Sequence, residues 1–180
     1  MRRRLLLPFV RGGIPASAAA TRVCPSCGRP LPEHGDRDVR FELPDTLVKP
    51  PKEWRPLIGG TESLLEVRGV TGFVRVRLPV RLSGGSSLRV GTWLRVAPDT
   101  FHRVREVFYE PAYAKLEIDG ELANAMWPWG PDLLGAPAIA RVLDPDEIPW
   151  VTGSSQSLLR SVLSDEWPHE EVFAAFRNAL

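Results

Sequence analysis

The clearest pattern in the chain is a strict alternation of apolar and polar side chains on both sides of a Gly/Ser-rich stretch at residues 83–87. The apolar members are Val74, Val76, Leu78, Val80 and Leu82 before this stretch, and Leu88, Val90, Leu94 and Val96 after it. A period of two places these side chains on one face of a strand, and a short flexible connection joins antiparallel neighbours. The pattern therefore predicts a long β-hairpin over about residues 70–97, with one apolar face and one arginine-rich face.

Helical spacing follows the hairpin. Pro98-Asp99-Thr100 is typical of a helix start, and the apolar residues after it recur every three or four positions. We therefore expect a helix over about residues 99–109, embedded between strands. Short strands are expected near residues 116–119 and 138–143, and apolar stripes beyond residue 154 predict a C-terminal helical tail. This order of elements favours an α+β fold built on a mainly antiparallel sheet.

The N-terminal part of the chain lacks such periodicity. Residues 1–22 are low in complexity, and we expect a disordered leader that precedes a single α+β domain over residues 23–180. Residues 24–56 contain seven prolines, and they disfavour a long helix. We expect this N-terminal segment to be irregular and Pro-rich.

Composition and charge exclude several classes of protein. Of the 180 residues, 43% are hydrophobic and 25% are charged, which is ordinary for a globular domain. A formal net charge of +1 provides no global attraction to nucleic acid or anionic lipid. No apolar run approaches the roughly 20 residues that cross a bilayer, so a soluble protein without a membrane partner is expected.

Cys24 and Cys27 are the only cysteines. Their C-x-x-C-G spacing is half of a zinc knuckle, in which a tight turn presents two thiolates to the metal. His34 is the candidate third ligand, with a fourth group unidentified. A degenerate knuckle with free thiols and a redox pair are the alternatives. Two cysteines are too few for a secreted disulfide framework, which favours a cytoplasmic protein with zinc as its only expected cofactor.

Two groups of side chains are candidate binding surfaces. The first is the polar face of the hairpin, which carries Arg75, Arg77, Arg89 and Arg95 around Trp93. Such a face could grip phosphates while the indole stacks on a base, but an ordinary solvated sheet face has the same pattern. The second group is Trp127 and Trp129, in a Trp/Pro/Gly loop that either lines a recognition pocket or plugs the end of the sheet.

The order of several short motifs resembles a known bacterial family. These motifs are Cys24-Pro-Ser-Cys27-Gly28, Phe73-Val74-Arg75, Gly91-Thr92-Trp93 and Gly120-Glu121-Leu122-Ala123-Asn124. Together they resemble domain-of-unknown-function family 2199 over roughly residues 23–165. The resemblance implies a bacterial setting and supplies no activity. It also implies a histidine soon after the knuckle, where this chain has Leu31, so His34 would have to substitute as the zinc ligand.

These observations together favour a small interaction or binding module without an assignable activity, whose partner, a protein being one candidate, the sequence does not specify. No Gly-rich phosphate loop, G-x-S-x-G elbow or H-E-x-x-H motif is present in the sequence, which does not favour an enzyme. Nucleic-acid binding is one alternative and requires hairpin arginines free of acidic partners. A zinc-containing enzyme of unknown reaction is the other, and it requires a histidine to converge with Cys24 and Cys27.

The zinc hypothesis makes a direct prediction. Purified protein should contain about one zinc per chain, and a Cys24→Ser, Cys27→Ser double variant should contain none, whereas Ser26→Ala should keep the metal. Thiolate ligands must be deprotonated, so the zinc content should fall on acidification. Elemental analysis of desalted protein measures all three. A metal-free wild type, or zinc retained by the double variant, contradicts the hypothesis.

Overall fold

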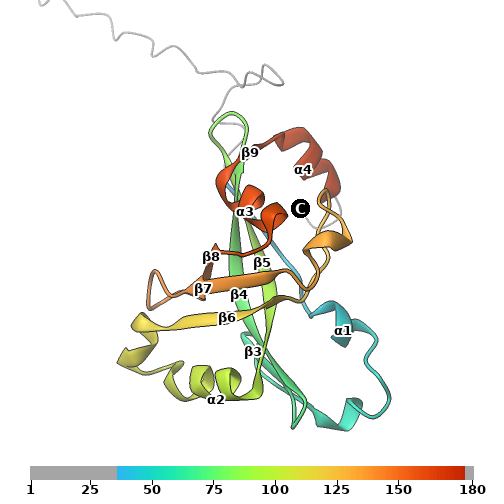
Figure 1. Ribbon diagram of the computed structural model, residues 1–180, viewed down its shortest axis with the longest axis vertical. Helices are drawn as coiled ribbons and strands as arrows, with labels where there is room; N and C mark the ends of the chain where they lie inside the picture. The colour runs from blue at the N-terminus through green and yellow to red at the C-terminus, as the bar shows by residue number, and fades with distance from the viewer. Residues whose placement is uncertain (1–35, 177–180) are drawn as a thin grey trace, which may run out of the picture.

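The structure is a computed structural model that describes residues 36–176, and the predicted hairpin is its central element. The strands of the hairpin, β4 (Thr71–Leu82) and β5 (Ser87–Val96), pair antiparallel from Gly72–Val96 to Arg81–Ser87. The hairpin runs along the long axis of the molecule, from the lower end to the top in Figure 1. The leader expected at residues 1–22 and the knuckle with its ligands (Cys24, Cys27 and His34) lie outside the described residues.

Five strands close into a barrel. β4, β5, β6 (Glu117–Leu122), β7 (Pro137–Arg141) and β8 (Trp150–Gly153) follow one another as antiparallel neighbours. β8 then returns to β4 in parallel, with Trp150 opposite Arg77. The expected α+β class and sheet-rich core are confirmed. The closure was not predicted, because β8 is short and carries no alternating pattern that marks it as a strand.

The sheet continues beyond the barrel along the free edges of the hairpin. β3 (Leu64–Val67) pairs with the start of β4, and β2 (Ile58–Gly60) pairs with β3. The end of β4 pairs with β9 (Glu166–Trp167), and β1 (Arg37–Arg40) lies parallel to the first half of β5. Each hairpin strand therefore has different neighbours along its length.

The apolar face of the hairpin fills the barrel. The nine alternating apolar side chains are at most 3% exposed, whereas Arg77 and Arg95 on the opposite face are half-buried and exposed. This arrangement confirms the predicted register, since a shift by one residue would reverse the two faces. A barrel of five strands is too narrow to hold a ligand among its side chains. Binding sites of this protein must therefore lie on the outside of the barrel.

The longer helices lie at the two ends of the barrel (Figure 1). α2 (Pro98–Val107) follows β5 at the lower end and buries Phe101 and Val104, which confirms the predicted embedded helix. α3 (Ser157–Ser164) and α4 (His169–Ala175) form the expected helical tail at the upper end. Shorter turns were not predicted: α1 (Asp45–Val48), η2 (Arg55–Leu57), η3 (Pro111–Lys115) and η4 (Pro131–Leu133). None of the described helices is long and apolar enough to cross a membrane.

Val76 tests the barrel core. Its side chain is fully buried between the strands, so Val76→Ala should lower the free energy of unfolding by about 1–3 kcal/mol through lost apolar contact and a residual cavity. Val48→Ala is the matched control, because Val48 is largely exposed and should change stability by less than about 0.5 kcal/mol. Urea denaturation measures both, and equal effects would contradict the core assignment.

Candidate functional site

The outer face of the hairpin is partly covered by residues 41–57, which we call the arm. A second, smaller apolar cluster lies between the arm and the sheet, and its buried members are Leu47, Val67, Phe73, Trp93 and Ala123. Trp93, considered from the sequence as a stacking platform, is fully buried in this cluster. Its ring is therefore not available at the surface to stack on a base.

Arg75 fastens the arm to the sheet. Its guanidinium donates to the carbonyl oxygen of Phe41 at 2.9 Å, and to those of Glu62 and Glu42 at 2.6 and 3.2 Å. The same guanidinium lies over the Trp93 ring, 4.4 Å from its centroid, and the Trp93 Nε1 donates to the Phe41 carbonyl at 3.1 Å. Burial lowers the pKa of Arg75. These bonds give Arg75 a structural role in holding the arm.

Asn124, the last residue of the motif 120–124, is a second fastening point and is fully buried. Its Oδ1 accepts hydrogen bonds from the Thr92 hydroxyl at 3.0 Å and from the Trp93 backbone N–H at 3.3 Å. Its Nδ2 donates to the Leu43 carbonyl at 2.9 Å and to an Asp45 carboxylate oxygen at 2.8 Å. One amide side chain therefore joins the sheet to the arm, with every donor and acceptor satisfied.

The other arginines of this face have acidic partners. Arg77 contacts Glu147 at 2.6 Å, Arg89 makes two bonds of 2.8 Å to Asp38, Arg81 contacts Glu166 at 3.5 Å, and Arg95 pairs with Glu121. The bond from Arg77 lowers the pKa of the Glu147 carboxyl, and the bond to Asp38 raises the pKa of Arg89. Such neutralisation favours an ordinary solvated sheet face over a phosphate-binding face.

Two hollows remain open on the outer face, one on each side of the Arg75 contact. The upper hollow has a volume of about 570 Å³ and is mostly charged, with Arg40, Arg75 and Arg77 among its walls. The lower hollow has a volume of about 470 Å³ and is mostly apolar. Both volumes lie within the range of ligand sites in proteins.

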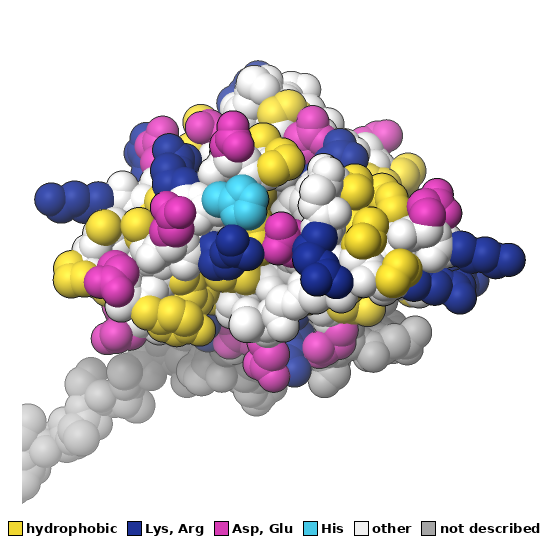
Figure 2. All heavy atoms as spheres, turned by 90° about the horizontal axis from the view of Figure 1, so that it is seen from below, with side chains coloured by type: hydrophobic (Ala, Val, Ile, Leu, Met, Phe, Trp, Pro, Cys, Tyr) yellow, Lys and Arg dark blue, Asp and Glu magenta, His cyan; other side chains and the backbone are white. Residues whose placement is uncertain are grey.

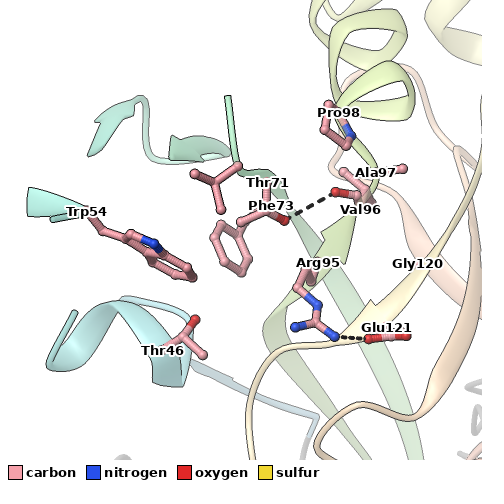
Figure 3. Close-up of a pocket in the computed structure, with 11 residues that line it drawn as sticks. Thr46, Trp54, Thr71, Phe73, Arg95, Val96, Ala97, Pro98, Gly120 and Glu121 are labelled. Atoms are coloured by element: carbon pink, nitrogen blue, oxygen red, sulfur yellow. Dashed lines mark hydrogen bonds and ion pairs between the residues drawn. The ribbon is translucent and has the colours of Figure 1, made fainter. Parts of the chain in front are cut away.

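The lower hollow combines aromatic walls with a single ion pair (Figure 3). Trp54 of the arm and Phe73 of β4 lie on one side of it, and the Arg95–Glu121 pair of β5 and β6 lies on the other. Arg95 stands directly opposite Glu121 in the strand register, and their side chains are 52% and 44% exposed. An apolar wall can bury part of a ligand, while the two charged groups orient polar atoms attached to it.

The two tryptophans of the Trp/Pro/Gly loop have different environments. Trp129 is buried and packs edge-to-face on Trp167, with ring centroids 5.4 Å apart, so it plugs the structure. Trp127 is 63% exposed. Neither lines the upper or the lower hollow. The tryptophan that lines the lower hollow is Trp54. Sequence analysis missed it because it lies in a Pro-rich segment without periodicity.

The structure does not test the zinc hypothesis. Within residues 36–176, no three His, Cys, Asp or Glu side chains are grouped so that they could hold a metal ion. Cys24, Cys27 and His34 precede the described residues, and their role as ligands stays a prediction.

Loss of the Asn124 amide should release the arm. Asn124→Ala leaves the Thr92 hydroxyl and the Trp93 N–H without their acceptor, and we expect the free energy of unfolding to fall by about 2–4 kcal/mol. Thr92→Val removes only one of these bonds and should cost about 1 kcal/mol. Urea denaturation, with limited proteolysis to locate cleavage within residues 41–57, measures the effect. Unchanged stability and cleavage in Asn124→Ala would show that the arm is held by other contacts.

Comparison with known proteins gives one match. The family described as uncharacterized protein conserved in bacteria (DUF2199) matches residues 23–162, which is more than three quarters of the chain. No curated protein and no solved structure matches the chain significantly. The matched residues include the arm, all five barrel strands and both hollows, and they confirm the resemblance drawn from the motifs. The chain thus belongs to this bacterial family of uncharacterized proteins.

Proposed function

We propose that this protein is a binding module and that the lower hollow takes an apolar side chain from a peptide segment of a partner protein. The observation that carries the proposal is the pairing of two aromatic walls, Trp54 and Phe73, with one accessible ion pair. Phe73 is already buried and forms a closed apolar wall, whereas the half-buried Trp54 ring still has apolar area that a ligand can cover. A partly exposed tryptophan of this kind contributes strongly to recognition.

The ion pair suits a peptide ligand. Exposed ion pairs contribute about 0–1 kcal/mol to stability, so Arg95 and Glu121 can exchange their mutual contact for ligand contacts at small cost. A peptide carries both a carbonyl acceptor for Arg95 and an N–H donor for Glu121. The opposite charges face each other directly across adjacent strands, so the two contacts lie side by side.

The lining of the lower hollow supports binding without catalysis. Among the described residues that line it, Arg95 and Glu121 are the only ones with ionisable side chains, and they neutralise each other. The described lining presents no nucleophile with a neighbouring base, which covalent and general-base mechanisms need. The same neutralisation removes the support for nucleic-acid binding. The alternative of a zinc-containing enzyme depends on Cys24 and Cys27, which lie outside the described residues. The proposal of a cytoplasmic location rests on the small number of cysteines in the sequence.

A neutral peptide-like probe tests the proposal. N-acetyl-L-tryptophanamide should bind saturably with a dissociation constant of about 0.1–10 mM, as its size allows. Chemical-shift changes in two-dimensional NMR spectra should gather around the lower hollow. Trp54→Ala should weaken binding at least about fivefold.

Trp127→Ala is the matched control, because Trp127 is an exposed tryptophan outside the lower hollow. It should leave the affinity for the probe unchanged. Binding that depends on Trp127 and ignores Trp54 would move the recognition surface to the Trp/Pro/Gly loop. No saturable binding would contradict the proposal.

A further inference from the structure

A separate pocket opens at the lower end of the molecule, between α2 and the strands β2 and β3. We call it the basal pocket. It has a volume of about 480 Å³ and shares no lining residue with the lower hollow. Figure 2 shows this end of the molecule, where Lys/Arg and Asp/Glu side chains alternate with apolar ones around a histidine. The basal pocket is therefore an independent site with its own composition.

The body of the basal pocket is apolar. Leu64 and Phe101 belong to the main core and form buried walls, and Ile58 of β2 is half-buried beside them. Tyr109 also lines the pocket, yet its side chain is 86% exposed. A large ring that is exposed beside a pocket gains apolar contact when that pocket is filled. The pocket thus offers burial to an apolar ligand group.

The charged groups of the basal pocket are unbalanced. Arg105 contacts the Glu66 carboxylate at 3.3 Å and the His102 Nδ1 at 3.0 Å, so it neutralises Glu66. Arg68 donates to the Pro56 carbonyl at 3.0 Å, and no carboxylate in the described part of the chain lies within ion-pair distance of it. Two arginines and one glutamate line the pocket. An excess positive charge therefore stands at the edge of an apolar cavity.

We propose that the basal pocket binds a small organic acid with an apolar tail. The tail packs against Leu64, Phe101 and Tyr109, and the carboxylate binds the Arg68 guanidinium. Hydrogen bonds between a guanidinium and a carboxylate are short and charge-assisted, so the acid is favoured over an alcohol with the same tail. This site is additional to the peptide surface of the lower hollow and does not depend on it.

Three probes with one tail separate the two parts of the proposal. 4-Phenylbutyrate, 4-phenylbutan-1-ol and 4-phenylbutylammonium share a phenyl ring on a four-carbon chain, and they differ in the charge of the terminal group. By NMR titration at low salt, 4-phenylbutyrate should bind about five- to tenfold more tightly than the alcohol, and the ammonium more weakly than both. The preference for the acid should shrink as salt is added.

Variants assign the parts of the site. Arg68→Gln should reduce the acid and the alcohol to similar affinities, and Arg68→Lys should restore part of the preference. Tyr109→Ala should weaken both probes about threefold, and it is tolerated because the ring is exposed. Arg81→Gln, which changes an exposed arginine at the far end of β4, is the matched control and should have no effect.

The outcomes distinguish the two proposals. Trp54→Ala should leave 4-phenylbutyrate binding unchanged, since Trp54 does not line the basal pocket. Equal affinity for acid and alcohol, or a preference that survives Arg68→Gln, would overturn the assignment of the carboxylate site. Absence of 4-phenylbutyrate binding would overturn the basal pocket as a ligand site, whatever the result for N-acetyl-L-tryptophanamide.

Discussion

The stacking of Arg75 on Trp93 is the contact on which the outer surface of this protein depends. A guanidinium over an indole ring is an attractive arrangement, and it strengthens when both groups are shielded from water. Here the two side chains also share one acceptor, the carbonyl of Phe41. These bonds hold the arm against β4 and β5 through its backbone, and the buried Leu47 side chain and the Asp45 carboxylate add further contacts. Trp54 can stand in the lower hollow because residues on either side of it are anchored.

The barrel stabilises the fold, and the arm contributes to the surface on which we propose that ligands bind. The barrel interior is filled by aliphatic side chains, so it supplies rigidity and offers no space for a ligand. The hollows and the pocket described above lie where other segments meet the sheet: the arm borders the upper and lower hollows, and α2 borders the basal pocket. Such junctions are natural binding sites, because two layers meet incompletely and leave polar and apolar groups side by side.

Much of the barrel could be predicted from the sequence, because alternation along one strand is a local property. The register of Val76 and the embedded helix followed from such local patterns. Closure through Trp150 and Arg77 depends instead on residues more than seventy positions apart, and no local pattern reports it. The same holds for the binding surface: Arg95 could be identified as a candidate, but its partner Glu121 and the facing Trp54 come from other elements. In the alternating pattern Trp93 occupies a position on the polar face, which predicts exposure. It is buried because the arm covers it, and the arm has no periodicity that would reveal this from the sequence.

The odd number of barrel strands decides where the chain enters and leaves. Because consecutive strands run in opposite directions, the fifth strand of such a closed meander points the same way as the first, as the parallel contact of β8 with β4 shows. The chain consequently enters the barrel at one end and departs from the other. The C-terminal helices cover the exit end (Figure 1), and the entrance end keeps the arm, α2, the lower hollow and the basal pocket. With an even number of strands, the helical tail would have emerged beside those openings and competed with any ligand for them.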